Sequence, residues 1–215
     1  MGAAERAAEK LRGQAEKAAL RHLKELLRGT GWRIYQTAIF RPLGDKFVVA
    51  FLETARNVDR VSFRLEAKPM AVDPLFWAIM DLETNAREPL SLRAWGAFVC
   101  DSVTIAESEL IAPLPPPDDV AAHFLRWAVD ASAAFIEHQG TVPFSQVVEA
   151  NEHYQARGAY AATLICSLIL EGRTSEAAAL AQAIASGRRR VVHTQTSEGR
   201  TFYERAAEWI VAHPA

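Results

Sequence analysis

The sequence predicts an α+β protein in which an antiparallel sheet flanked by helices is followed by a C-terminal helical extension. The predicted order is helix, three strands, helix, two strands, helix, and then the extension. The strongest reason is the strict alternation of polar and apolar residues over Arg60–Lys68, which is typical of an antiparallel strand with one buried face. The proline-rich run 113–117 cannot join a central strand and therefore ends the sheet. We predict two domains, 1–140 and 141–215.

A long first helix is predicted over residues 3–28, where Gly29 and Gly31 end it. One broad face should pack on the sheet and consists of Ala4, Ala8, Leu11, Ala15, Ala19, Leu23 and Leu26. Another face is a basic ridge formed by Arg6, Lys10, Lys17, Arg21, Lys24 and Arg28. Such a ridge is usually a solvated helix face, but it also suits an acidic partner or an anionic surface. The alanine-rich face would also allow the helix to pair with its copy in a dimer.

The first three strands are predicted to form a meander. Trp32–Arg41 and Lys46–Thr54 should make a hairpin through residues 42–45, and Arg60–Lys68 is the third strand. Phe47–Leu52 is apolar on both faces, so the second strand should be central or covered by a helix or a partner. The third strand should turn one set of side chains toward a helix layer and the other set toward solvent or a partner. The first set is Val61, Phe63 and Leu65, and the second is Arg60, Arg64 and Glu66.

The second half of the predicted sheet domain begins with a short helix. Asp73 and Pro74 should cap and begin this helix, which ends near Asn85. Its inward side chains are those of Leu75, Phe76, Ile79, Met80 and Leu82. Two strands follow, Leu90–Val99 and Val103–Ile111, with a turn at Asp101 and Ser102 between them. A helix that Asp118 or Asp119 caps and Gly140 closes should end the domain.

Composition narrows the classes of function. The chain has 215 residues, is 50% hydrophobic and carries a formal net charge of −2, so nucleic-acid binding would need a local basic patch. Cys100 and Cys166 are too few for a disulfide framework and are expected to be reduced, buried packing residues. The sequence shows neither a signal peptide nor an apolar run long enough to cross a membrane. We therefore expect a cytoplasmic protein without a metal, a cofactor, a nucleic-acid partner or a membrane contact.

The extension is predicted to be helical and contains two polar clusters. Glu149, Glu152 and His153 lie within about one helical turn, where the histidine could pair with Glu149, bind a metal or act as a base. Arg188–Arg190 with His193 could clamp a phosphate or a carboxylate, because guanidinium groups match planar anions. A solvated surface pair and a solvated helix end are the plainer interpretations. The sequence contains no HExxH, GxSxG or phosphate-loop spacing.

The element order over residues 3–139 resembles the type III secretion chaperone-like fold, which secretion chaperones share with bacterial YbjN-like proteins. The stretches most similar to the YbjN-like pattern are Leu75–Leu82 with Asn85, Leu90–Trp95, Val103–Ile105 and the helix from Asp119. This resemblance implies a module that binds proteins, often as a homodimer, and that has no catalytic residues. The chain departs from the pattern by adding Thr141–Ala215.

We therefore expect a protein-binding, chaperone-like or adaptor module of a bacterial cell rather than an enzyme, with a protein partner and a homodimer. Trp77 and Trp95 are core or rim aromatics that could instead line a binding groove. The candidate partner-binding residues are Arg6, Lys10, Lys17, Arg21, Trp77, Trp95, Arg188, Arg189 and Arg190. Two alternatives stay open. One is an immunity or antitoxin-type protein that binds a cognate toxin, which acidic clefts would favour. The other is a small-molecule-binding enzyme that uses Glu149, Glu152 and His153 or the three arginines.

Overall fold

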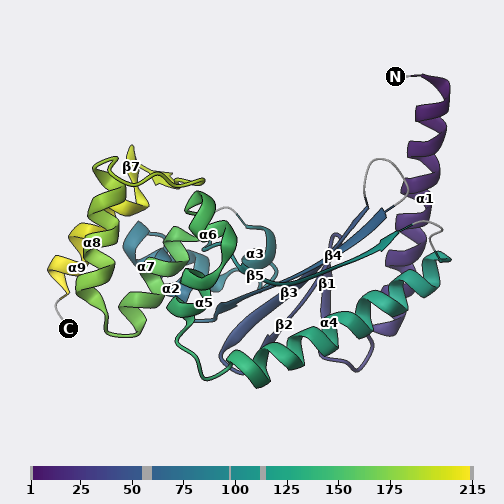
Figure 1. The fold of residues 1–215 in the computed structure, drawn as a ribbon, viewed down its shortest axis with the longest axis horizontal. Helices are drawn as coiled ribbons and strands as arrows, with labels where there is room; N and C mark the ends of the chain where they lie inside the picture. The colour runs from purple at the N-terminus through teal and green to yellow at the C-terminus, as the bar shows by residue number, and fades with distance from the viewer. Residues whose placement is uncertain (1, 55–59, 97, 112–114, 214–215) are drawn as a thin grey trace. The chain divides into compact units, whose positions relative to one another are not determined.

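The computed structural model describes residues 2–54, 60–96, 98–111 and 115–213. It confirms the α+β class, because helices accompany a five-stranded antiparallel sheet and a small two-stranded sheet (Figure 1). Contacts divide the chain into two compact units. Unit 1 is Met1–Arg41, Val48–Glu66 and Thr104–Gly140, and unit 2 is Pro42–Phe47, Ala67–Val103 and Thr141–Ala215. The boundary predicted at residue 140 is one of the unit boundaries, but unit 2 also takes two segments from the predicted first domain.

The five strands lie in the sheet in chain order, from β1 to β5. They are β1 (Arg33–Tyr35), β2 (Ala38–Leu43), β3 (Lys46–Thr54), β4 (Arg60–Pro69) and β5 (Val103–Ile111). β1 and β2 are antiparallel, with Ile34 opposite Ile39. β3 is the middle strand, and Phe47–Leu52 is buried throughout, as its apolar pattern predicts. The chain therefore covers this strand by itself.

Two of the strand predictions are wrong. Residues 32–41 do not form one strand, because Gln36 adopts a φ of 53° and the chain turns there between β1 and β2. The stretch 90–99 is not a strand in the part of it that the structure describes; Leu92–Trp95 forms the short helix α3 instead. Asp101 and Ser102 consequently lead into β5 rather than joining two strands. The sheet has the expected number of strands. The predicted strands Lys46–Thr54, Arg60–Lys68 and Val103–Ile111 correspond to β3, β4 and β5, whereas the other two predicted segments are not single strands.

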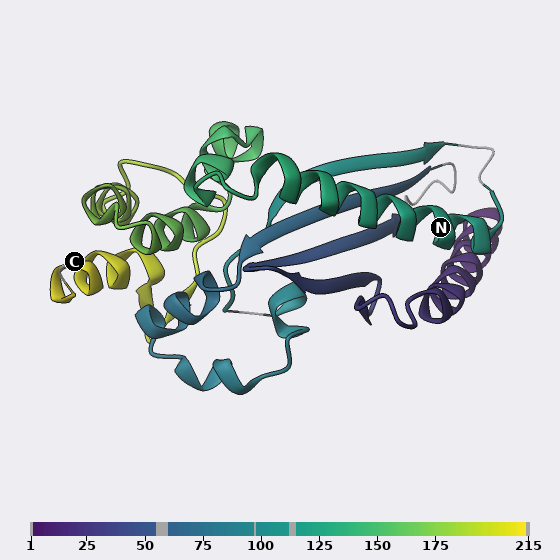
Figure 2. The same ribbon diagram turned by 90° about the horizontal axis from the view of Figure 1, so that it is seen from below.

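The core of unit 1 lies between β4 and helix α4 (Pro117–Gln139). Val61, Phe63 and Leu65 are buried, as the alternation predicts. The Phe63 ring centroid lies 5.2 Å from that of Phe124 and 5.6 Å from that of Trp127, both on α4. Figure 2 shows α4 running along the strands. The predicted helix layer over β4 is therefore α4.

The first helix, α1 (Ala3–Leu26), packs against α4, a contact that the sequence did not predict. Ala19 and Leu23 of its predicted apolar face are buried, whereas Ala15 is exposed. The side chains of Ala4, Ala8 and Leu11 lie outside the described residues. Only the C-terminal half of the predicted face can therefore be compared with the structure.

Unit 2 is mainly helical, which confirms the predicted C-terminal helices. Its elements are α2 (Val72–Met80), η1 (Glu83–Arg87), α3, α5 (Phe144–Ala150), α6 (Glu152–Arg157), α7 (Ala161–Leu170), α8 (Thr174–Ala185), β6 (Thr196–Ser197), β7 (Arg200–Thr201) and α9 (Phe202–Ala212). Helices α2, α5, α8 and α9 all contact α7. Phe76 of α2 stacks on Phe202 of α9, with ring centroids 4.8 Å apart. Within the described residues, no helix is long and apolar enough to span a membrane.

The start of α2 differs from its prediction. Ala71 is the N-cap, so Asp73 and Pro74 are the second and third residues of the helix. The helix ends at Met80, where Asp81 has a φ of 56°, and a separate 3-10 turn carries the chain past Asn85. The Asp73 carboxylate does not cap the helix and instead takes part in a buried network of polar contacts.

Candidate functional site

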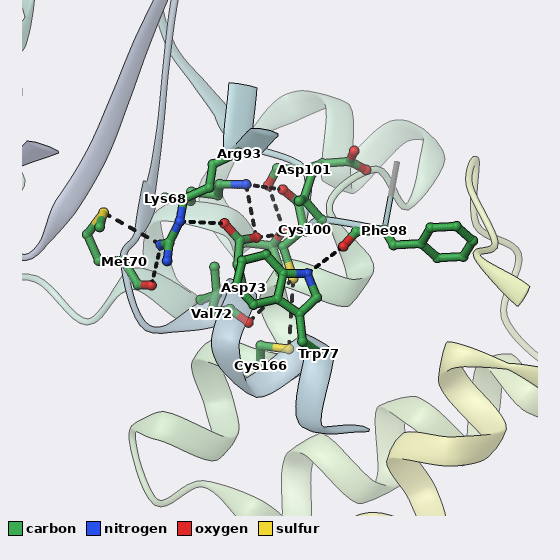
Figure 3. A network of polar contacts seen from close by, with 12 residues as sticks. Lys68, Met70, Val72, Asp73, Trp77, Arg93, Phe98, Cys100, Asp101 and Cys166 are labelled. Atoms are coloured by element: carbon green, nitrogen blue, oxygen red, sulfur yellow. Dashed lines mark hydrogen bonds and ion pairs between the residues drawn. The ribbon is translucent and has the colours of Figure 1, made fainter. Parts of the chain in front are cut away.

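Unit 2 contains a buried ion pair between the C-terminal end of β4 and the first turn of α2. The Lys68 Nζ lies 3.0 Å from the Asp73 Oδ1, and both side chains are 0% exposed. Lys68 also donates to the Cys100 carbonyl at 2.6 Å, and Asp73 accepts from the Cys100 N–H at 2.9 Å (Figure 3). The alternation over Arg60–Lys68 puts Lys68 on the same side of the strand as Arg64 and Glu66, which predicts exposure to solvent, but the structure buries its side chain. The pair fixes the backbone at Cys100.

Arg93 and Trp77 complete this network. Arg93 donates to the Met70 carbonyl at 2.7 Å, and its guanidinium lies 5.5 Å from the Trp77 ring centroid. The Trp77 Nε1 donates to the Phe98 carbonyl at 2.7 Å, and the side chain is 2% exposed (Figure 3). Trp77 is therefore a core residue, which corrects its place among the partner-binding candidates. The side chain of Trp95, the other candidate, lies outside the described residues.

The two cysteines meet next to this network. Cys100 and Cys166 are both buried, as predicted, and their sulfur atoms are 3.9 Å apart. Burial raises the pKa of the Cys100 thiol, with further contributions from Cys166 and Asp73. A thiol held in its neutral form and away from solvent is a poor nucleophile. We therefore assign the network a structural role.

A small polar pocket also lies in unit 2. Its lining includes Asp101, Tyr160, His193, Gln195 and Tyr203, and its volume is about 10 Å³. A cavity of this size holds about one water molecule. Burial raises the pKa of the Asp101 carboxyl, partly opposed by His193 and Lys68. The pocket is too small for a substrate, although its side chains are of kinds that catalysis uses.

Unit 1 carries an open groove on the solvent face of its sheet. The groove measures about 370 Å³ and is lined by Glu53 of β3, by Ser62, Phe63 and Arg64 of β4, and by Glu107, Ser108 and Glu109 of β5. Alternation places Ser62 and Arg64 on the face opposite to the buried side chains of β4. Three adjacent strands thus contribute side chains to one polar surface.

The charge on this surface is predominantly negative. The Arg64 Nη2 lies 2.9 Å from Glu53, its Nε lies 2.9 Å from Glu66, and its guanidinium covers the Phe51 ring at 5.0 Å. The Arg60 Nη1 lies 3.3 Å from Glu109. Three carboxylates therefore share two guanidinium groups across the strands, and Glu107 on β5 adds a fourth negative charge to the surface. We call this surface the acidic face, comprising Glu53, Arg60, Ser62, Arg64, Glu66, Glu107 and Glu109.

The predicted basic candidates are exposed, and none of them is among the residues that line the groove. Arg6, Lys10, Lys17 and Arg21 are exposed along α1, as expected of a helix ridge. Arg188–Arg190 are exposed in unit 2, where the Arg188 Nε donates to the Ser186 Oγ at 3.0 Å and the Arg189 guanidinium lies 4.9 Å from the Tyr154 ring centroid. These two arginines are engaged by different neighbours, which does not support one anion clamp.

The predicted cluster of Glu149, Glu152 and His153 does not sit on one helix. α5 ends at Ala150, and Asn151 adopts an extended conformation before α6 begins. The Glu149 carboxylate lies 3.8 Å from Arg173, while the His153 N–H donates to the Asn151 side chain. Among the residues described, no group of three or more His, Cys, Asp or Glu side chains is placed to hold a metal ion. Glu149 and His153 therefore lack the shared helix on which an i,i+4 pairing would depend.

Comparison of the chain with protein-family models, with curated proteins and with solved structures found no match. The acidic face is therefore interpreted from its own geometry.

Sequence reasoning identified Arg60, Arg64 and Glu66 as facing solvent or a partner, but it missed Glu53, Glu107 and Glu109. The signal for the last two was present, because both alternate with less polar neighbours in the predicted strand Val103–Ile111.

Proposed function

We propose that this chain is a protein-binding module of the chaperone-like or adaptor type, and that the acidic face of unit 1 is its contact surface. The observation that carries the proposal is the groove of about 370 Å³ into which three strands project charged side chains. Exposed charged and polar side chains that gather on a rigid sheet are suited to recognition, since the backbone beneath them loses little freedom on binding.

A catalytic role for the same surface has less support. The groove is open to solvent, whereas electrostatic catalysis depends on a site that excludes water. Its two arginines form ion pairs with neighbouring carboxylates at about 3 Å. Two of these ion pairs link adjacent strands, and a substrate anion would have to displace the carboxylates in order to bind. The carboxylates outnumber the arginines, so negative charge remains on the face for ion pairs with a partner, which favours binding over chemistry.

The resemblance to the type III secretion chaperone-like and YbjN-like pattern supports the same function, because it implies protein binding. It also implies a homodimer, which remains a prediction. The sequence offered two features that a dimer could bury, the alanine-rich face of the first helix and the apolar strand Phe47–Leu52. The strand is buried by its own chain, so it no longer supports a dimer. The proposed partner is therefore a different protein rather than a second copy.

Affinity capture from the native host tests this function. The tagged wild-type chain should retain a partner at near-equal stoichiometry, and the Glu107→Lys/Glu109→Lys variant should lose it. Asp130→Lys/Glu137→Lys is a matched control, because it makes the same change in net charge at exposed positions of α4 in the same unit. Equal retention by both variants, or equal loss from both, would contradict a role for the acidic face.

An immunity or antitoxin-type role is a second candidate, and the acidic groove favours it. A cognate toxin with a cationic surface would be attracted to this face and held by ion pairs. The distinction lies in what binding does: an immunity protein abolishes the activity of its partner at a 1:1 ratio, while a chaperone or adaptor leaves it intact or delivers it. Measuring the captured partner's activity with and without this chain separates the two.

A further inference from the structure

We propose that the acidic face binds an extended, lysine- or arginine-rich segment of a partner protein, which adds to the outer edge of β5 as a sixth strand. This inference rests on the proposed function and specifies the chemistry of the partner and the geometry of binding.

The position of β5 provides the first part of the argument. β5 is the last strand in the sheet order and spans nine residues, whereas the opposite edge strand, β1, spans three. Figure 2 shows β5 at the border of the sheet, beyond β4. An edge strand directs alternate N–H and C=O groups away from its sheet, and a peptide of about five or six residues can pair with them. Such backbone pairing gives affinity, and side chains at alternate positions give specificity.

Charge identifies the added strand. Glu107 and Glu109 are two residues apart on β5, so both project onto the acidic face, where Glu66 lies on the adjacent strand β4 and Glu53 on the next strand, β3. A strand beside β5 would place every second side chain on this same face. Lysine or arginine at those positions would meet Glu107 and Glu109 as cross-strand neighbours, and opposite charges in such pairs stabilise a sheet. An acidic strand would be repelled.

The same charges disfavour a second copy of the chain at this edge. Antiparallel pairing of two β5 strands would bring Glu107 and Glu109 of both copies onto one continuous face. Like charges directly opposite each other destabilise strand pairs, and charged side chains at sheet edges are a known means of preventing self-association. A basic segment can pair with the outward N–H and C=O groups of β5 without this repulsion.

Peptide binding measured by fluorescence anisotropy tests the inference on the full chain. The probe is a labelled peptide of about ten residues in which lysine alternates with valine or threonine, compared with a version that carries glutamate in place of lysine. Wild type should bind the basic peptide, and Glu107→Lys/Glu109→Lys should weaken this binding roughly tenfold, while Asp130→Lys/Glu137→Lys leaves it within about twofold. Equal weakening by both variants would overturn the inference in favour of overall charge alone.

Backbone methylation of the peptide tests strand addition separately. N-methyl groups on one set of alternate residues face β5 and should abolish binding, whereas methyl groups on the other set face away and should be tolerated. Equal binding of the two methylated peptides would exclude an added strand. Light scattering could instead show that the wild-type chain is a dimer and that the Glu107→Lys/Glu109→Lys variant is a monomer. This result would assign the edge to a second copy of the chain and would also overturn the inference.

The two levels of the proposal fail in different ways. If the captured partner depends on Glu107 and Glu109 but the wild-type chain binds no basic peptide, the function stands and strand addition is wrong. If neither a partner nor a peptide depends on these glutamates, both proposals are wrong.

Discussion

Phe63 and Arg64 are neighbours on β4 that face opposite sides of the sheet, and they test the assignment of the two faces. Phe63 is 1% exposed and contacts three rings of α4, so Phe63→Ala should lower the free energy of unfolding by about 3–5 kcal/mol. Arg64→Ala removes two partly exposed ion pairs and the cover over Phe51, and should cost about 1 kcal/mol. Denaturant unfolding of both variants measures the contrast. Similar losses would mean that the faces are wrongly assigned.

The buried pair of Lys68 and Asp73 makes a second prediction. Asp73→Ala would leave the Lys68 ammonium and the Cys100 N–H buried without their carboxylate, which should cost about 3–5 kcal/mol of unfolding free energy. Glu208→Ala, which removes an exposed ion pair with Arg200 in the same unit, is the control and should change the unfolding free energy little, because solvent screens that pair. Thermal or denaturant melts in which the two variants lose similar stability would show that the network is not buried as described.

The raised pKa of the Asp101 carboxyl leads us to expect that the stability of the folded chain depends on pH. Because burial raises the pKa of its carboxyl in the folded chain above the ordinary 3.8, folding favours the protonated form. Its contribution to stability is complete below about pH 3.8 and is lost as the pH rises through the folded-state pKa. Asp101→Asn, which cannot ionise, should therefore be more stable than wild type at neutral pH, and the difference should shrink in acid. A difference that stays constant between neutral and acidic pH would contradict the direction of the shift.

At the scale of elements, α9 has the best-defined start. The Thr201 hydroxyl accepts from the Glu204 N–H, and the Glu204 carboxylate accepts from the Thr201 N–H, which makes a capping box. Thr201→Ala should lower the unfolding free energy by about 1 kcal/mol, whereas Thr194→Ala, at an exposed position before the β6–β7 hairpin, should have little effect. Chemical denaturation of the two variants compares them directly, and equal effects would count against the cap.

Elements with a strong local pattern could be predicted from the sequence, and those shaped by distant contacts could not. β4 and α4 follow their periodicity, because burial against each other reinforces the local preference. Residues 92–95 form a helix in place of a strand, and Arg93 of that helix is held by Met70 and Trp77 from elsewhere in unit 2. The turn at Gln36 uses a left-handed conformation without glycine or asparagine, so the sequence gives no sign of it.

The residues of the candidate site also divide into those that the local sequence pattern predicts and those that depend on distant contacts. The outward side of β4 was predictable from alternation, and this includes Arg60, Arg64 and Glu66. The contribution of β3 and β5 required the sheet order, because only adjacency of the strands brings Glu53, Glu107 and Glu109 onto one surface. The proposed catalytic cluster failed because Asn151 breaks the helix on which its spacing depended.

At the scale of the whole molecule, we expect the two units to differ in what their side chains do. Unit 2 has a helical core tied by a buried ion pair and ring stacking, which are features of stability. Unit 1 presents a charged, open sheet face beside a long edge strand, which are features of recognition. Variants of the buried network should therefore alter stability, and variants of the acidic face should alter binding while the melting temperature changes little.

Hydrogen–deuterium exchange of the chain alone and with its co-purified partner tests the central claim most directly, because it reports which backbone amides a partner covers. We predict slower exchange in β5, over Val103–Ile111, and in the adjoining part of β4 when the partner is bound. The α1 ridge of Arg6, Lys10, Lys17 and Arg21 and the segment Arg188–Arg190 should exchange as in the free chain. Protection confined to either basic segment, with β5 unchanged, would contradict the assignment of the acidic face as the binding surface.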